Sequence, residues 1–300
     1  MIPLFDLHSD TLLEIYKRKL SFFDNTELHI SLKRAHPFSP YIQVASVWSD
    51  AMLDDEGAYL QYLDVIKYAK NSSLFFTTSP SNLRDFSLIL ALEDARILCG
   101  DISRLERLHS DGVRVLTLNW KGISSIGGAW DTDFSLSQFG IDTVKACFEL
   151  GILPDISHSS AVACNQVLDL CEKYGFATLA SHSNAYSICK HKRNLTDDLF
   201  IRMREHGFVV GISLVPEHIS KNDATIYDVL KHIEHYLSLE GESIISLGCD
   251  FDGTSSLPKE ISSIEDLTIL YNEVSCAFGR DVAQKLFFKN AYRFMVKNLK

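Results

Sequence analysis

Short apolar runs alternate with longer segments of helical periodicity along the whole chain. Several of these runs are continuously apolar, as expected for strands of a parallel sheet that is buried on both faces. The predicted strands are Ile2–His8, Ile42–Trp48, Ser87–Glu93, Val113–Asn119, Ile152–Ser157, Ala177–His182, Phe208–Ser213 and Ser243–Cys249. The predicted helices are Glu56–Lys70, Ile102–Ser110, Ser137–Leu150, Ala161–Tyr174, Asp197–His206, Thr225–Leu239, Ile264–Phe278 and Asp281–Val296.

This alternation predicts an α/β fold of the (β/α)8 TIM barrel type, because eight strand-then-helix units within about 250 residues match that barrel in number and size. The alternative is an open, doubly wound sheet, but no glycine-rich dinucleotide turn follows the first strand. The sequence contains no linker, low-complexity tract or internal repeat, so residues 1–300 are predicted to form a single barrel domain. The stretch 12–40 is the least regular and predicts an insertion or a lid.

The composition indicates a globular protein that handles small molecules. Hydrophobic residues make up 46% of the 300 residues, which is enough to bury a substantial core. The formal net charge of −10 argues against nucleic acid or an anionic membrane as the main partner.

The cysteines and the N-terminus bear on the compartment. The seven cysteines are odd in number and contain no C-x-x-C pair, which indicates reduced thiols in a cytoplasmic protein. The first residues lack the basic region and apolar stretch of a secretory signal. No apolar run approaches the ~20 residues that a membrane span needs. We therefore expect a soluble, cytoplasmic protein with no membrane partner.

Ionisable side chains recur where the predicted strands end. Alternate residues of a strand share a face, so Asp6, His8 and Asp10 point the same way, and an imidazole beside carboxylates can hold a divalent metal. The later strand ends carry Glu93, His158, His182 and Asp250. In a barrel these ends converge on one face, so the sequence predicts a site for two metal ions about 3.5–4 Å apart with a shared carboxylate.

Each of these residues also has an ordinary structural explanation. A single histidine at a strand end is more often a hydrogen-bonded structural residue than a metal ligand. Asp250 and Asp252 before Gly253 are typical of a turn, and Glu93-Asp94 could cap the following helix. These explanations account poorly for the same pattern at five separate strand ends.

Seven short strings in this chain resemble the membrane (renal) dipeptidases, peptidase family M19, which are two-zinc barrels of the amidohydrolase, metal-dependent hydrolase type. They follow the family order from residue 6 to residue 253, so the resemblance covers nearly the whole chain. The strings are Asp6-Leu7-His8-Ser9-Asp10, Leu92-Glu93, Leu116-Thr117-Leu118, Asp155-Ile156-Ser157-His158, Ser181-His182-Ser183-Asn184-Ala185-Tyr186-Ser187, Arg193-Asn194-Leu195-Thr196-Asp197-Asp198 and Gly248-Cys249-Asp250-Phe251-Asp252-Gly253.

The resemblance implies a centre with two Zn²⁺ ions, and manganese or iron could occupy the same ligands. His8 and Asp10 would bind one ion, His158 and His182 would bind the other, and Glu93 would bridge both. Many amidohydrolases instead begin with His-x-His and use a carbamylated lysine as the bridge. The aspartate and the glutamate in this chain favour the dipeptidase branch.

The resemblance also implies two residues that act on the substrate. Asp250 matches the catalytic acid/base, and with the bridging Glu93 it completes the predicted catalytic set. Arg193 matches the arginine that binds the C-terminal carboxylate of the substrate, a role that suits the two-pronged guanidinium group. Asp6, Asp252 and Asn184 could hydrogen-bond metal-bound imidazoles or serve in ordinary strand-end hydrogen bonds.

One position departs from the family pattern. This chain has Asn119-Trp120 where the animal enzymes have Thr-His, a histidine that contacts the scissile carbonyl. We retain Trp120 as a candidate substrate-binding residue, with a packing role at the barrel mouth as the alternative. The segment Leu214-Val215-Pro216-Glu217-His218 also diverges from the family, so no substrate contact is assigned there.

These residues lead to a hypothesis about the reaction. The resemblance implies zinc-dependent hydrolysis of dipeptides through a metal-bridging hydroxide, because paired zinc ions lower the pKa of water towards ~7. One alternative keeps the fold and metals but takes a cyclic amide, a lactam or an N-acyl amino acid as substrate. Another is a catalytically silent barrel that only binds. The expected partner is a small dipeptide, and a homodimer is common in the family.

Overall fold

A curled, parallel sheet of seven strands forms the centre of the computed structural model, which describes residues 1–79 and 84–299. Its strand order is β5-β4-β3-β2-β1-β7-β6, so β1 lies between β2 and β7, and the consecutive strands β5 and β6 form the two ends of the sheet. The strands are β1 (Ile2–Ser9), β2 (Phe38–Trp48), β3 (Phe86–Glu93), β4 (Val113–Thr117), β5 (Leu153–Asp155), β6 (Val210–Ile212) and β7 (Ile245–Leu247).

The predicted eight-stranded barrel is confirmed in part. Seven predicted strands are present, with the last three only three residues long. The predicted strand Ala177–His182 is not a strand of this sheet. It makes two isolated parallel bridges, Leu179 with Asp155 of β5 and Ala180 with Val210 of β6. The pairing of β1 with β7 excludes the doubly wound alternative, in which the first and last strands would not be neighbours.

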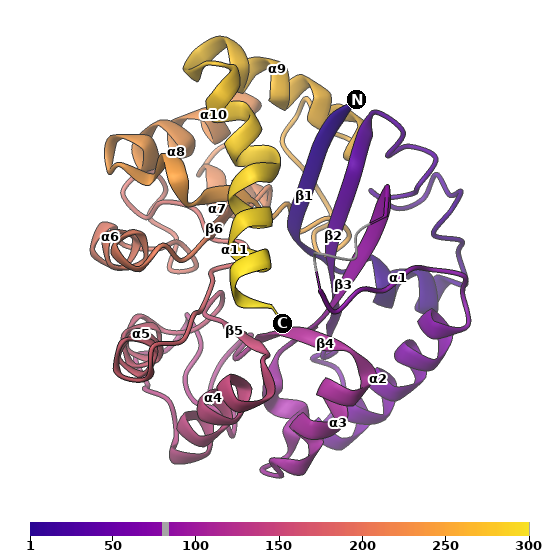
Figure 1. The fold of residues 1–300 in the computed structure, drawn as a ribbon, viewed down its shortest axis with the longest axis vertical. Coiled ribbons are helices and arrows are strands. Elements are labelled where there is room, and N and C mark those ends of the chain that lie inside the picture. Colours follow the sequence, from indigo (N-terminus) through magenta and orange to yellow (C-terminus); the bar gives the residue numbers. More distant parts are fainter. Residues whose placement is uncertain (80–83, 300) are drawn as a thin grey trace.

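Helices surround the sheet, as Figure 1 shows. They are α1 (Thr11–Arg18), α2 (Asp55–Lys70), α3 (Ser103–Asp111), α4 (Gln138–Leu150), α5 (Ala161–Tyr174), α6 (Asp197–His206), α7 (Pro216–Ile219), α8 (Ile226–Ser238), α9 (Leu267–Phe278), α10 (Arg280–Gln284) and α11 (Asn290–Asn298). Short helical turns lie at η2 (Ala95–Leu98), η3 (Gly241–Ser243), η4 (Ile264–Asp266) and η5 (Lys285–Lys289). Among the described residues, no helix has the length and apolar character to cross a membrane.

Local sequence signals determine where several helices begin and end. The helices α5 and α6 start after Ser160 and Thr196. The hydroxyl oxygens of these two residues accept hydrogen bonds from backbone N–H groups of the first turn. Both end at a glycine in the left-handed conformation, Gly175 and Gly207. Because these signals are local, the predicted bounds of both helices match the structure.

The stretch 12–40 contains most of α1 and the start of β2. Helix α1 has eight residues, and its buried side chains include Leu12, Leu13 and Ile15, too few to produce a clear helical period. Between the two elements, the backbone oxygen of His29 accepts a hydrogen bond of 3.0 Å from Ile264 N–H. This segment therefore lies against the chain that follows β7.

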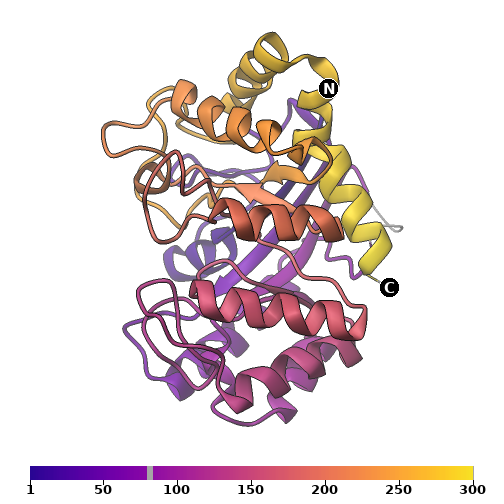
Figure 2. The ribbon, with the colours of Figure 1, turned by 90° about the vertical axis from the view of Figure 1, so that its left-hand side faces the viewer.

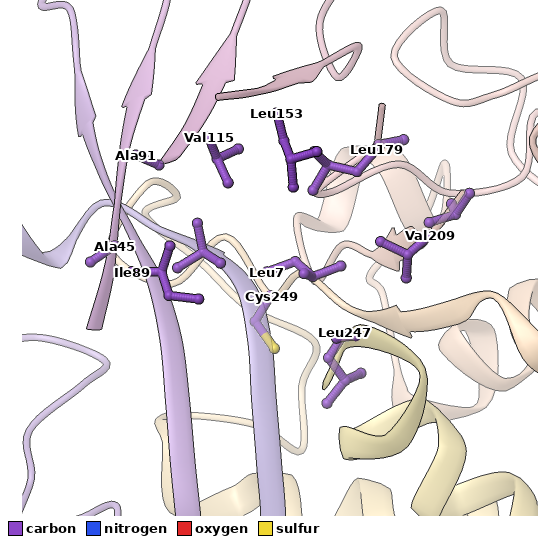
Figure 3. Close-up of a cluster of buried hydrophobic side chains, with 14 of the residues drawn as sticks. Leu7, Ala45, Ile89, Ala91, Val115, Leu153, Leu179, Val209, Leu247 and Cys249 are labelled. Carbon is purple, nitrogen blue, oxygen red and sulfur yellow. The ribbon is translucent and has the colours of Figure 1, made fainter. Parts of the chain in front are cut away.

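Apolar side chains from successive strands fill the space inside the curved sheet, as Figure 3 shows. They are no more than 5% exposed and include Leu7, Ala45, Ile89, Val115, Leu153, Leu179, Val209, Leu247 and Cys249. Burial of each large apolar side chain contributes roughly 1.5–3 kcal/mol to folding. The interior is therefore packed, and chemistry is confined to an end of the sheet.

The C-terminal helices cover the amino-terminal end of β7. Asn290 in α11 donates hydrogen bonds to the carbonyl oxygens of Glu242, before β7, and Ile245, its first residue, at 2.9 and 2.8 Å. In Figure 2, α11 lies on the same side of the molecule as both chain termini. The carboxyl ends of the strands therefore remain free to hold a site.

Candidate metal centre

The carboxyl ends of four strands and one bridging segment bring the predicted site residues together. His8 lies in β1 and Glu93 ends β3, while the remaining residues come within three positions after a strand or lie in the 177–182 segment. All are no more than 9% exposed, and the set is His8, Asp10, Glu93, His158, His182 and Asp250. The tertiary structure thus gathers residues that are as far apart as 242 positions in the sequence.

One half of the site surrounds His8. Its Nε2 atom lies 3.9 Å from Asp10 Oδ2, 3.6 Å from Glu93 Oε2 and 3.7 Å from Asp250 Oδ1. Gly253 makes room for the two aspartates, because a Cβ there would lie 2.3 Å from Asp10 Oδ2 and 2.4 Å from Asp250 Oδ1.

The other half contains two imidazoles. Glu93 Oε1 lies 2.9 Å from His158 Nε2 and 3.7 Å from His182 Nε2, and these two nitrogen atoms are 2.9 Å apart. Glu93 therefore directs one carboxylate oxygen to each half of the site. This is the arrangement expected of a carboxylate that bridges two cations.

Hydrogen bonds determine which nitrogen of each imidazole carries the proton. His158 Nδ1 lies 3.1 Å from the carbonyl oxygen of Trp120, which can only accept, so Nδ1 donates. His182 Nδ1 lies 2.7 Å from Ser181 Oγ, and that hydroxyl donates its own hydrogen to Asp155 at 2.5 Å. Both imidazoles therefore present an Nε2 lone pair to Glu93.

This donor set fits a bound cation. Two Nε2 lone pairs and a carboxylate oxygen converge without a proton between them, and His8 Nε2 and Asp10 Oδ1 are buried without a hydrogen-bond partner. Buried polar atoms rarely remain unpaired, so each of these atoms needs a partner. Two ligand groups meet the distance requirements of a metal site, His8–Asp10–Glu93 and Glu93–His158–His182.

A third group, His8–Asp155–His182, is equally compact but has a different role. The Asp155 carboxylate already accepts hydrogen bonds from Thr117 Oγ1, Ser181 Oγ and two backbone N–H groups. Asp155 therefore orients His182 through Ser181. The sequence analysis missed this role, since Thr117 and Ser181 lie 38 and 26 positions away in the sequence.

The pKa values of His158 and His182 favour cation binding. Burial lowers the pKa of His158 to about 4 and that of His182 well below 6.5, so both imidazoles are neutral ligands at neutral pH. Burial also lowers the pKa of His8, but the charges and hydrogen bonds of Glu93 and Asp10 raise it well above 6.5. Burial, with Glu93 beside it, raises the pKa of Asp10 to about 7. A divalent cation would relieve the repulsion between these carboxylates.

Asp6, Asp252 and Asn184 have structural roles rather than contacts with the imidazoles of the site. Asp6 accepts hydrogen bonds from the backbone N–H groups of Cys249 and His8 at 2.8 and 3.3 Å. Asn184 exchanges two hydrogen bonds with the Ser213 backbone. Asp252 accepts from the Thr11 hydroxyl and the His29 N–H, both at 2.6 Å. The ordinary structural alternative accounts for Asp252 and Asn184, whereas Asp6 Oδ2 is buried without a hydrogen-bond partner.

The site opens into a cavity of about 380 Å³. Arg193 lines it, is only 4% exposed, and has no hydrogen-bond partner at Nε or Nη2. Burial lowers the pKa of Arg193 to about 10, while Asp250 and Glu93 act to raise it, so the guanidinium stays charged at neutral pH. Trp120 also lines the cavity. A buried cation with free N–H groups suits a carboxylate ligand.

Removal of divalent ions should destabilise the protein. Chelation is expected to lower the Tm by roughly 5–10 °C, since a ligand at 100 times its Kd adds about 2.7 kcal/mol and 1 kcal/mol shifts the Tm by about 2–4 °C. Thermal melting of chelated and zinc-reloaded protein, with metal content from elemental analysis, measures this effect. Equal Tm values together with no retained metal would contradict a metal centre.

Comparisons with known proteins agree with this geometry. A family model described as "Membrane dipeptidase (Peptidase family M19)" matches residues 1–299. An uncharacterized dipeptidase of Schizosaccharomyces pombe is 31% identical over an alignment of 312 positions. The alignment covers 90% of this chain and 74% of the relative.

Two solved structures share the fold. The dipeptidase AC, a metallopeptidase of family M19, has a TM-score of 0.89 at 23% identity and covers 99% of both chains. A metallopeptidase of Rhodobacter sphaeroides, bound to a phosphinate mimic of the dipeptide L-Ala-D-Ala, has a TM-score of 0.89 at 22% identity and covers 100% of this chain and 99% of its own.

Proposed function

We propose that this chain, which belongs to the membrane dipeptidase family (peptidase family M19), hydrolyses the peptide bond of dipeptides with two Zn²⁺ ions at the candidate metal centre. The observation that carries the proposal is Glu93, with one carboxylate oxygen beside His8 and the other beside His158 and His182. One ion would be held by His8, Asp10 and Glu93, and the other by Glu93, His158 and His182.

When bound, the paired ions would lower the pKa of a water molecule and polarise the substrate carbonyl. The protein then has to receive a proton and return it. Asp250 suits this role because it lines the cavity and its Oδ1 lies 3.7 Å from His8 Nε2. Burial raises the pKa of Asp250 to about 6, so at neutral pH it is an ionised base that can pass the proton to the departing amine.

Arg193 would bind the C-terminal carboxylate of the substrate. Arg193 lines the cavity. A guanidinium at a fixed place there would set one distance between that carboxylate and the metal centre, which we expect a dipeptide to span with a single peptide bond. Longer peptides would place their carboxylate too far away. The proposed site therefore selects substrates by length.

Charge in the cavity favours a dipeptide over an N-acyl amino acid. Outside the proposed metal centre, Glu14, Asp252 and Lys121 also line the cavity. The Glu14 carboxylate would suit the free ammonium group of a dipeptide, which an N-acyl amino acid, a lactam or a cyclic amide lacks. The R. sphaeroides structure with its phosphinate dipeptide mimic supports the same substrate class.

A substrate panel tests this proposal. Rates on L-L and L-D dipeptides, a tripeptide and N-acetyl amino acids would be measured with chelated protein and after addition of Zn²⁺ or Mn²⁺. We expect metal-dependent hydrolysis of dipeptides and little turnover of the tripeptide. Preferential hydrolysis of N-acetyl amino acids would contradict the proposal in favour of the amidohydrolase alternative.

The role of Arg193 predicts a defined kinetic change. Arg193→Met is expected to lower kcat/KM for dipeptides by roughly 10²-fold, mainly through KM, since loss of one partner of a buried charge pair removes about 2–5 kcal/mol. The variant should also lose the preference for Ala-Ala over its C-terminal amide. Lys190→Met removes an exposed charge nearby and is the matched control. An unchanged KM in Arg193→Met would exclude the carboxylate contact.

The same proposal includes the complete (β/α)8 barrel as one catalytic domain over residues 1–300, with 12–40 as an insertion or a lid. The two bridges made by Leu179 and Ala180 support closure of the sheet between β5 and β6.

A further inference from the structure

All three tryptophans of this chain, Trp48, Trp120 and Trp130, line the metal-centre cavity. They come from separate elements: Trp48 ends β2, and the other two lie in the connection between β4 and α4. Each is only partly buried. Large aromatic surfaces that remain accessible in a cavity are available for contact with a ligand.

Two of these rings form a wall beside the metal ligands. Trp48 and Trp120 have ring centroids 4.9 Å apart at an angle of 57°, and the Trp120 ring lies 6.3 Å from that of His158. Lys17 Nζ lies 5.7 Å from the Trp48 ring and is itself held by Asp50 at 2.6 Å. We call the pair Trp48 and Trp120 the tryptophan wall.

Trp48 and Arg193 come from distant parts of the sheet order, whereas Trp120 lies nearer, beside His158. Trp48 ends β2, the middle strand of the sheet order. Arg193 follows the segment that bridges the two outer strands, β5 and β6. Because the sheet is curled, its middle strand faces these outer strands across the interior. Trp130, in contrast, packs against His191 on the side of Arg193, with ring centroids 5.3 Å apart.

This arrangement assigns a direction to the substrate. If Arg193 holds the C-terminal carboxylate and the scissile bond lies at Glu93, the N-terminal residue extends towards the tryptophan wall. Resting on the proposed function, we propose that Trp48 and Trp120 form the subsite for the N-terminal side chain and select dipeptides whose N-terminal residue is aromatic. Aromatic rings pack favourably on one another at centroid distances of about 4.5–7 Å.

Three dipeptides test the proposal with zinc-loaded protein: Phe-Ala, Ala-Ala and Ala-Phe. We expect kcat/KM for Phe-Ala to exceed that for Ala-Ala by roughly tenfold or more, as apolar pockets discriminate to this degree. Ala-Phe, which carries its ring on the other side, should not share this gain. A gain for Ala-Phe alone would overturn the assigned direction.

Substitutions of the tryptophans test which residues cause the expected preference for Phe-Ala over Ala-Ala. Trp48→Leu and Trp120→Leu should each reduce the ratio of Phe-Ala to Ala-Ala turnover by at least about threefold, while Trp48→Phe, which keeps an aromatic ring, should retain most of the ratio. Trp130→Phe is the matched control and should leave the ratio unchanged. Thermal melting verifies that each variant is folded, and an unaltered ratio in both leucine variants would overturn the proposal.

Binding without turnover gives a second readout. In an Asp250→Asn background, intrinsic tryptophan fluorescence should report tighter binding of Phe-Ala than of Ala-Ala, by a similar factor. Equal affinities would overturn the subsite. Absence of hydrolysis of every dipeptide by metal-loaded protein would instead overturn the proposed function, so the two failures are distinguishable.

Discussion

Asp250→Asn is expected to lower kcat for dipeptides by roughly 10²–10⁴-fold, the usual contribution of a general base, while both metal ions stay bound. The substituted amide keeps the size of the carboxylate but cannot accept a proton. Asp250 belongs to neither compact ligand group at Glu93, so the ligands themselves are unchanged. Steady-state kinetics with elemental analysis of the same sample measures both quantities.

The pH profile gives this prediction a second test. The pKa of Asp250 is raised to about 6 by burial, and bound cations would lower it, so kcat/KM should fall as the pH drops through a value at or below about 6. The Asn variant should lose this acidic limb. Asp133→Asn, at an exposed acid in the loop after β4, is the control. Full activity of Asp250→Asn would remove Asp250 from the mechanism.

Glu93→Gln is expected to abolish the metal centre. The amide has one oxygen where the carboxylate has two, and its NH2 group would face either His8 or the pair His158 and His182. Bound zinc should fall from two ions to at most one, and activity should drop by roughly 10³–10⁴-fold, because Lewis-acid stabilisation contributes several kcal/mol.

Elemental analysis and activity at increasing zinc concentration check this result. Glu93→Asp keeps the charge on a shorter side chain, so it should retain more metal than Glu93→Gln. Two tightly bound zinc ions in the Gln variant would contradict a bridging role for Glu93.

The sequence predicted regular structure well where the signals are local. The helices α5 and α6 have their predicted bounds because serine, threonine and glycine residues define their ends. The predicted helix Asp281–Val296 instead divides into α10, the π-helical turn η5 and α11. The turn η5 packs on β1 and β7, a contact that no local pattern encodes.

The candidate site likewise combines residues that the sequence identified with contacts that only the tertiary structure shows. The motifs identified His8, Glu93, His158 and Asp250, and the structure brings all four together at the carboxyl end of the sheet. The orienting role of Asp155 was not predictable, because its partners Thr117 and Ser181 are remote from it in the sequence. The gathering of the tryptophans was likewise not predictable, since Trp48 ends β2 and Trp120 follows β4, and β3 lies between these two strands.

By itself the sequence determined the family, the candidate ligand residues and their positions at strand ends. Only the tertiary structure decided that Glu93 faces His8 with one oxygen and His158 with the other, and that Arg193 Nε and Nη2 are buried without hydrogen-bond partners. It also decided that the three tryptophans line one cavity. Side-chain alternation in strands and the residues that begin or end a helix act over a few positions, so they can be recognised in the sequence. Distances across the cavity depend instead on the curl of the sheet, which arises from packing among strands that are remote in sequence.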